Sequence, residues 1–328
     1  MRVMIYTTFP VNAWRIPPGH VAELRARFQD VTFVQAMNGD EALELFADVD
    51  AALSPMMSPA MAERATKLRW VHSAAAAVAD LLPLEALARK GIVVTNSRGV
   101  QAVPMAEQVM AGLLALTRRL DITLAAQRER RWVQEQLGDV DRPWMLDGKR
   151  MTIVGLGTIG EAIAVRAQAF GVRITGVRRR PELGGSTVVE RVVGPDQLDQ
   201  ALSGADIVVI TAPFVASTTG MIGEAQLALL NRGAILVNVG RAQIVDTAAM
   251  IRALESGQLG GAVLDVFDQE PLDAASPLWT MPNVVITPHS AGFRATHWDA
   301  VAGLFAVNLT RWLKGEPLLN IVDAGAGY

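Results

Sequence analysis

The glycine pattern Gly155-x-Gly157-x-x-Gly160 constrains the fold of this chain more than any other feature of its sequence. It follows an apolar run, residues 150–154, and it opens a segment with helical spacing, residues 161–170. In a strand–turn–helix unit the first glycine permits the tight turn, the second lets a pyrophosphate approach the main chain, and the third lets helix and strand pack closely. The helix N-terminus then faces the phosphates. The pattern therefore predicts a dinucleotide site.

The rest of the chain alternates between short apolar runs and helical segments, which is typical of an α/β fold with parallel sheets. With 328 residues, the chain has the length of about two domains. A helix or helix pair is expected over residues 104–134, and a loop over residues 138–148. The predicted strands cover residues 2–6, 31–34, 51–53, 70–72, 91–95, 150–154, 172–177, 205–211, 234–239, 262–266 and 284–287. The later runs are continuously apolar, as in a sheet covered on both faces.

Composition excludes several classes of site and partner. The net charge of -3 gives no argument for nucleic acid or for an anionic membrane surface. The absence of cysteine excludes disulfides, thiolate metal sites and cysteine nucleophiles, and no metal site is predicted. The N-terminal residues lack the apolar region of a signal peptide, and the longest apolar helix candidate, residues 109–117, is far below the ~20 residues that span a bilayer. We therefore expect a cytoplasmic protein.

Three arginines stand where the second strand of the nucleotide-binding unit ends. In enzymes that prefer NAD, an acid at this point accepts hydrogen bonds from the ribose hydroxyls. Here the residues are Arg178, Arg179 and Arg180, which can pair with a 2′-phosphate. The sequence thus favours NADP over NAD. A solvated basic loop without a role in cofactor binding is the alternative.

An arginine, a glutamate and a histidine follow three further predicted strands. They are Arg241 in Asn238-Val239-Gly240-Arg241, Glu270 in the segment that starts at Asp265, and His289 after Pro288. Ligands of open α/β sheets bind outside the carboxyl ends of the strands, so these side chains are expected to converge.

The chemistry of these three side chains fits the reduction of a 2-oxo acid. Arg241 can clamp the carboxylate and polarise the neighbouring carbonyl. Hydride delivery places negative charge on the carbonyl oxygen, and a protonated His289 can donate the proton that this oxygen needs. A carboxylate beside the histidine, for which Glu270 is the candidate, favours the charged imidazole and orients the ring.

At these residues the chain resembles the D-isomer-specific 2-hydroxyacid dehydrogenases. The similarity covers nearly the whole chain and is densest from Thr95 to Gly292. The segments that carry it are Thr95-Asn96 with Gly99, Ala106-Glu107, the arginine signature 236–246, the glutamate signature 264–272 and the histidine signature 287–292. The C-terminal residues 319–328 look like those of members near the glyoxylate/hydroxypyruvate reductases.

The resemblance implies two Rossmann-like domains with doubly wound parallel sheets. A substrate domain, residues 1–98 and 293–328, would be interrupted by a dinucleotide-binding domain, residues 99–292. It also implies a catalytic set of Arg241, Glu270 and His289, and a homodimer joined through the nucleotide domain by the helices of residues 104–134. The residues expected to bind the cofactor are Gly155, Gly157, Thr158, Ile159, Gly160, Arg178, Arg179, Arg180, Thr211, Pro213, Thr218, Val239 and Asp265, the last of them near the nicotinamide carboxamide.

The loop expected to bind the substrate departs from the family pattern. The family often has glycines there, whereas this chain has Ala74 to Ala77. Main-chain amides of Ala75, Ala76 and Ala77, with Arg241 and His289, would hold the substrate, and the added methyl groups restrict the backbone. In the arginine signature, alanine at position 242 replaces the usual glycine.

Three other functions compete with reduction of a small 2-oxo acid. Formate dehydrogenases share the fold but carry glutamine where Glu270 stands, so this glutamate argues against formate oxidation. A reductase of larger 2-oxo acids and a nucleotide-sensing protein like the corepressors of this fold both stay compatible with the sequence.

Overall fold

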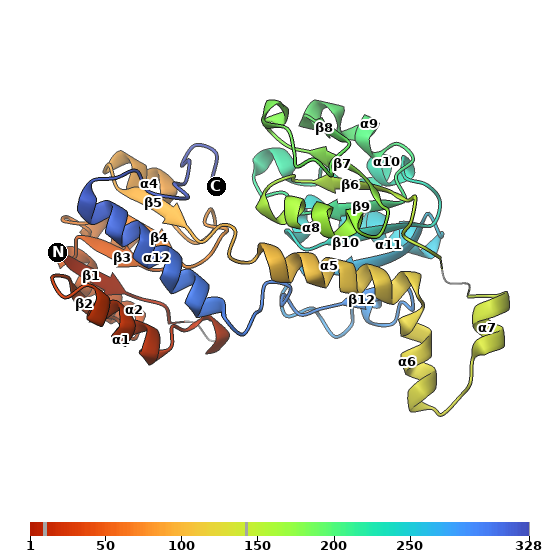
Figure 1. Cartoon of the computed structure of the whole chain (residues 1–328), viewed down its shortest axis with the longest axis horizontal. Helices are drawn as coiled ribbons and strands as arrows, with labels where there is room; N and C mark the ends of the chain where they lie inside the picture. The colour runs from red at the N-terminus through yellow and green to blue at the C-terminus, as the bar shows by residue number, and fades with distance from the viewer. Residues whose placement is uncertain (9–11, 142–143, 328) are drawn as a thin grey trace. The chain divides into compact units, whose positions relative to one another are not determined.

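The computed structural model describes residues 1–8, 12–141 and 144–327. The chain divides into two compact units, and the second is inserted into the first (Figure 1). Unit 1 comprises Met1–Gln101 and Phe293–Tyr328, and unit 2 comprises Ala102–Gly292. The boundaries expected from the sequence lay after residues 98 and 292. The α/β class with two parallel sheets is confirmed.

Unit 1 is built on a five-stranded parallel sheet with the order β2-β1-β3-β4-β5, a doubly wound arrangement. Its strands are β1 (Arg2–Ile5), β2 (Thr32–Gln35), β3 (Ala51–Leu53), β4 (Trp70–Ser73) and β5 (Val93–Asn96). Its α-helices are α1 (Pro18–Arg27), α2 (Gly39–Leu45), α3 (Pro59–Arg64), α4 (Leu84–Arg89) and α12 (His297–Lys314). One buried cluster joins α1 and α12 to one face of the sheet, and a second joins α2, α3 and α4 to the other face.

Unit 2 is built on a seven-stranded parallel sheet with the order β12-β11-β10-β9-β6-β7-β8. Its strands are β6 (Arg150–Val154), β7 (Arg173–Val177), β8 (Arg191–Val193), β9 (Ile207–Ile210), β10 (Ala234–Asn238), β11 (Leu259–Leu264) and β12 (Val284–Ile286). Its α-helices are α5 (Ala102–Thr117), α6 (Leu120–Arg128), α7 (Gln134–Asp139), α8 (Thr158–Gln168), α9 (Leu198–Leu202), α10 (Glu224–Ala228) and α11 (Thr247–Glu255). The strand order reverses between β6 and β9, which is where doubly wound sheets bind dinucleotides.

Both faces of this second sheet are covered, as the continuous apolar runs indicated. Helices α5 and α8 share a buried cluster with one face, and α9, α10 and α11 share another with the opposite face. Helix α5 lies very close to the sheet at Gly112, where a Cβ atom would stand 2.4 Å from Val263 Cγ1. Glycine at this position therefore permits the close approach of helix and strand.

The sequence prediction missed one strand of unit 2 and placed the start of one loop too early. The half-buried edge strand β8 was not expected, because Val192 and Val193 are its only apolar residues. The segment 104–134 holds the helix pair α5 and α6, one of the two arrangements expected there, and the two helices are separated at Arg119, a residue with a φ of 57°. The expected loop over residues 138–148 begins inside α7, which ends at Asp139; residues 142–143 lie outside the described part.

No helix among the described residues is both long and apolar enough to cross a membrane. The described part of the chain also holds no cluster of three or more histidine, aspartate or glutamate side chains that could bind a metal ion.

Candidate active site

The glycine turn after β6 has the geometry that its pattern predicts. Gly155 has a φ of +105°, and a Cβ atom there would stand 2.3 Å from the main-chain nitrogen of Ala212. At Gly160 a Cβ atom would stand 2.8 Å from the carbonyl oxygen of Gly155, so this glycine lets α8 pack on the strand. At Gly157, the N-cap of α8, a Cβ atom would meet nothing within 4 Å. The open space at Gly157 fits the approach of a pyrophosphate to a helix N-terminus.

The arginine segment that follows β7 is held in part by the chain itself. Arg178 is half-buried, and its Nη1 donates to the carbonyl oxygen of Gly184 at 2.5 Å. Arg179 and Arg180 are exposed. The predicted role of all three in cofactor choice stays a prediction.

The other residues expected near the cofactor lie at the carboxyl ends of β9 and β10. Thr211 donates its hydroxyl to the Gly155 carbonyl at 2.7 Å, which ties the segment after β9 to the glycine turn. The Thr218 hydroxyl donates to the Pro213 carbonyl at 2.8 Å and so closes the next turn. The side chain of Val239 is buried in the apolar core, which leaves only its main chain for a ligand.

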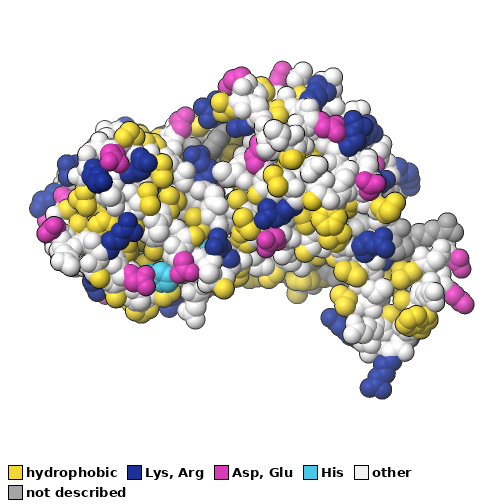
Figure 2. All heavy atoms as spheres, in the orientation of Figure 1, with side chains coloured by type: hydrophobic (Ala, Val, Ile, Leu, Met, Phe, Trp, Pro, Cys, Tyr) yellow, Lys and Arg dark blue, Asp and Glu magenta, His cyan; other side chains and the backbone are white. Residues whose placement is uncertain are grey.

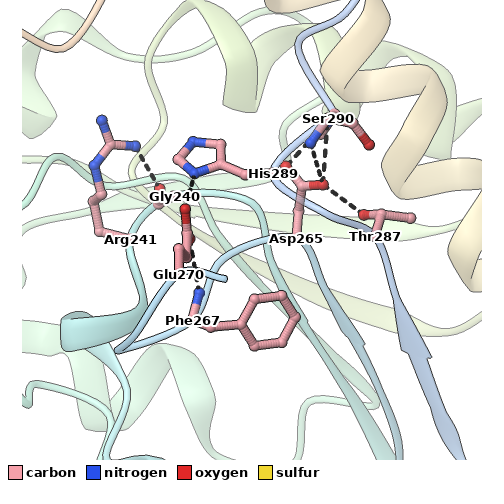
Figure 3. Close-up of polar contacts among 9 residues, drawn as sticks. Gly240, Arg241, Asp265, Phe267, Glu270, Thr287, His289 and Ser290 are labelled. Carbon is pink, nitrogen blue, oxygen red and sulfur yellow. Dashed lines mark hydrogen bonds and ion pairs between the residues drawn. The ribbon is translucent and has the colours of Figure 1, made fainter. Parts of the chain in front are cut away.

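His289 and Glu270 form a direct pair. Nδ1 of His289 lies 2.6 Å from Glu270 Oε2, while the other carboxylate oxygen accepts from the main-chain N–H of Phe267 at 3.0 Å. Figure 3 shows the carboxylate directed at the ring. His289 is exposed, and its Nε2 has no hydrogen-bond partner among the described residues. Glu270 therefore orients the ring through Nδ1, and Nε2 points outward.

The main chain holds His289 in an uncommon conformation. Its φ is 51°, in the left-handed region that few residues other than glycine adopt. The N–H of His289 donates to the carbonyls of Asp265 and Thr287 at 2.9 and 3.0 Å, and these bonds hold the strained turn. Such strain is typical of functional sites and is maintained by the surrounding contacts.

Arg241 lies at the turn that follows β10. The buried Asn238 fixes this turn, because its amide donates to the Arg241 carbonyl at 3.1 Å and its Oδ1 accepts from the Gly240 N–H at 3.0 Å. The guanidinium donates through Nη1 to the Gly240 carbonyl at 2.9 Å. In Figure 3 it extends to the same side of the sheet as the His289 ring. Among the described residues, no group accepts from its Nε or Nη2.

Asp265 has a structural role that the sequence prediction missed. The residue is 2% exposed, and its carboxylate accepts from the Thr287 hydroxyl at 2.5 Å and from the N–H groups of Ser290 and Ala291 at 2.9 and 3.0 Å (Figure 3). It thus holds the histidine turn on both sides of His289. The signal for this role was an acid at the end of an apolar run, where a buried carboxylate needs several donors. Its predicted contact with the cofactor stays a prediction.

The alanine loop expected to bind the substrate follows β4 in unit 1. The N–H of Ala75 donates to the Ser73 hydroxyl at 3.2 Å. The N–H groups of Ala76 and Ala77 donate to no other group in the described part of the chain. Of the three amides named from the sequence, these two are therefore available to an anion.

Comparisons with known proteins establish the family. The model for "D-isomer specific 2-hydroxyacid dehydrogenase, NAD binding domain" matches residues 110–291, which span the glycine turn and the residues after β10, β11 and β12. The chain belongs to the D-isomer specific 2-hydroxyacid dehydrogenase family.

Individual relatives agree with this assignment. The chain is 36% identical to the glyoxylate reductase of Korarchaeum cryptofilum over 290 residues, which cover 86% of this chain and 85% of that protein. It is 30% identical over 299 residues to the D-3-phosphoglycerate dehydrogenase of Methanocaldococcus jannaschii, but it covers only 55% of that longer protein. A D-isomer specific 2-hydroxyacid dehydrogenase of Xanthobacter autotrophicus Py2, solved in complex with NADPH and MES, is 31% identical and superimposes with a TM-score of 0.81 over 99% of both chains. The chain is an NAD(P)-dependent oxidoreductase that acts on 2-hydroxyacids.

Proposed function

We propose that this enzyme reduces a small 2-oxo acid of the glyoxylate or hydroxypyruvate type with NADPH. The observation that carries the proposal is the pair formed by His289 Nδ1 and Glu270 Oε2 at 2.6 Å, beside a turn that carries Arg241. An outward imidazole held by a carboxylate and accompanied by a guanidinium is what proton transfer to a 2-oxo acid requires. The glyoxylate reductases among the relatives support the choice of substrate.

The nicotinamide cofactor, when bound, supplies the hydride. The space at Gly157 and the N-terminus of α8 would hold its pyrophosphate. Arg241 would pair with the substrate carboxylate and polarise the carbonyl through its uncommitted N–H groups.

His289 would donate a proton from Nε2 to the carbonyl oxygen as negative charge develops there. The Glu270 carboxylate accepts the Nδ1–H, so it fixes the tautomer in which a neutral ring presents the Nε2 lone pair outward. The same ring can then take the proton back from a 2-hydroxy acid in the oxidative direction.

The preference for NADPH rests on the residues after β7. No acid stands at positions 178–180 to repel a 2′-phosphate, and the exposed Arg179 and Arg180 lie on the same turn. The similar Xanthobacter enzyme was solved with NADPH. Initial rates at 340 nm with NADPH and NADH at equal concentration test this choice. A charge-assisted pair predicts a kcat/KM for NADPH at least about tenfold higher; equal or better use of NADH would refute it.

The substrate class is tested with a series of 2-oxo acids of rising size, from glyoxylate through hydroxypyruvate and pyruvate to phenylpyruvate. The methyl groups of Ala75, Ala76 and Ala77 would lie beside a carboxylate held by the N–H groups of this loop, so we expect kcat/KM to fall with substrate size. A maximum at phenylpyruvate would instead favour a reductase of larger 2-oxo acids. Tight NADPH binding without turnover of any member would favour a nucleotide sensor.

We also propose a homodimer joined through unit 2. Helices α6 and α7 project from the sheet of this unit, and Figure 2 shows hydrophobic side chains on them. Exposed apolar residues of this segment and its flanks are Leu120, Leu124, Trp132, Val140 and Met145, with Trp132 89% exposed. An exposed apolar projection of this kind is typical of an interface. Light scattering should give a mass twice that of the 35.2 kDa chain, and Leu124→Asp should lower it.

A further inference from the structure

A chain of buried hydrogen bonds connects the sheet of unit 1 to the alanine loop. Trp70 Nε1 donates to Thr95 Oγ1 at 2.9 Å, and Thr95 Oγ1 lies 2.8 Å from His72 Nδ1. His72 Nε2 lies 3.3 Å from Ser97 Oγ, which in turn donates to the Ser73 carbonyl at 2.9 Å. All five residues are at most 2% exposed, so none of these groups can exchange its partner for bulk water.

The direction of each bond follows from the Ser73 end of this chain and from the neutral state of the ring. The Ser73 carbonyl can only accept, so the Ser97 hydroxyl uses its one hydrogen there and accepts from His72 Nε2–H. Burial lowers the pKa of His72 to about 3, so the ring is neutral near neutral pH and carries only this one N–H group. Nδ1 therefore accepts from the Thr95 hydroxyl, whose oxygen accepts in turn from the Trp70 indole.

The residues at the end of β5 hold the carbonyl groups of the alanine loop on one side. Ser97 binds the Ser73 carbonyl through its hydroxyl, and its main-chain N–H donates to the Ala75 carbonyl at 3.1 Å. Asn96 Nδ2 donates to the Ala76 carbonyl at 2.7 Å.

The planar trans peptide then determines where the N–H groups of the loop point. In such a peptide the C=O of one residue and the N–H of the next point in opposite directions. With the Ala75 carbonyl bound by Ser97, the N–H of Ala76 points away from it. With the Ala76 carbonyl bound by Asn96, the N–H of Ala77 points away in the same manner.

We propose that Asn96 and Ser97 are positioning residues for the substrate carboxylate, with His72 orienting the Ser97 hydroxyl. They hold the loop carbonyls inward, so that the N–H groups of Ala76 and Ala77 stay directed at the bound anion. This inference rests on the proposed function of the alanine loop as the carboxylate subsite.

The test compares Ser97→Ala and Asn96→Ala with a matched control, Ser54→Ala. Ser54 is also fully buried in unit 1, and its hydroxyl also donates to a main-chain carbonyl, that of Met56 at 2.6 Å. Loosening the loop should raise KM for glyoxylate at least about tenfold in both test variants, since small misplacements of binding groups are costly. The dissociation constant for NADPH should stay unchanged. The control should keep the wild-type KM, even where its melting temperature falls as far as that of Ser97→Ala.

Two variants of His72 distinguish its proposed role in orienting the Ser97 hydroxyl from a role in filling space in the core. His72→Gln keeps an N–H group that can reach Ser97, whereas His72→Leu keeps the bulk without a donor. KM should rise less in the glutamine variant than in the leucine variant. Equal values in the two would refute the role of His72, and a wild-type KM in both Ser97→Ala and Asn96→Ala would refute the proposal as a whole.

Ala76→Pro distinguishes failure of this inference from failure of the proposed subsite. Proline removes the N–H of residue 76 but keeps its carbonyl. Ala77→Pro does the same one residue later, and the melting temperature and NADPH affinity show which variant is folded. An unchanged KM for glyoxylate in a folded proline variant would refute the proposal that this loop binds the substrate carboxylate. A raised KM there, with wild-type values for Ser97→Ala and Asn96→Ala, would overturn only the positioning role.

Discussion

The buried histidine of unit 1 makes the stability of the protein depend on pH in a calculable way. Burial lowers the pKa of His72 from its ordinary 6.5 to about 3 in the folded chain. Between these values the unfolded chain binds a proton that the folded chain does not, so stability falls as the pH falls below about 6.5. With about 1.4 kcal/mol for each pH unit, His72 removes about 2 kcal/mol of unfolding free energy between pH 7.5 and pH 5.

The variant His72→Gln isolates this contribution, since glutamine does not titrate. Its stability is compared with that of the wild type by urea unfolding at pH 7.5, 6 and 5. Tryptophan fluorescence is a suitable signal, because Trp14, Trp70, Trp298 and Trp312 belong to the same unit as His72. We expect the difference in unfolding free energy, wild type minus variant, to fall by about 2 kcal/mol between pH 7.5 and pH 5.

The other buried histidine does not disturb this comparison. Burial and the charge of Arg294 lower the pKa of His297 to about 4, but His297 titrates in both proteins and cancels from the difference. His72→Asn should reproduce the trend. A difference between wild type and variants that stays constant across the pH range would refute the neutral, buried state of His72.

Three further predictions concern unit 2. His289→Gln should lower kcat about 10²-fold or more while the dissociation constant for NADPH stays unchanged. Glu270→Gln should lower kcat with the fold intact. Wild-type turnover at 340 nm in either variant would contradict the assigned proton transfer. Asp265→Ala should lower both the melting temperature and kcat, because three donors lose their acceptor; a wild-type thermal transition would contradict its role in the histidine turn. Gly157→Val should raise the dissociation constant of NADPH without changing the melting temperature. Gly155→Ala should destabilise the fold, because the added Cβ atom would clash with the main chain of Ala212. Thermal unfolding and calorimetric titration of NADPH separate the two effects.

The parts of the site that the sequence predicted are those controlled by short segments. The apolar run at Arg150–Val154 is a strand with those bounds, because its residues are buried from Met151 onward. The glycine turn follows from steric requirements at Gly155 and Gly160 and from the open space at Gly157, and all three positions are visible in the pattern. The placement of Arg241, Glu270 and His289 after strand ends likewise needed only the order of apolar runs.

The features that were missed depend on contacts between distant segments. The edge strand β8 has only two apolar residues and forms by pairing with β7. Ser97 donates to Ser73 across 24 positions of the sequence, and Ala291 donates to Asp265 across 26. The pairing of such hydroxyl, amide and carboxylate groups is decided by tertiary packing, so periodicity and composition carry no signal for it.

Two of the carboxylates that follow β11, Asp265 and Glu270, show how burial distinguishes a structural role from a chemical one. Asp265 is 2% exposed, and its oxygens accept from three donors around the histidine turn, so its charge stabilises the backbone that holds His289. Glu270 lies five residues later at the exposed end of the same segment, and Oε2 is left for the imidazole. Loss of Asp265 should therefore reduce stability and turnover together, since buried donors lose their acceptor. Loss of the Glu270 charge should reduce turnover alone, because the groups it contacts stay accessible to water.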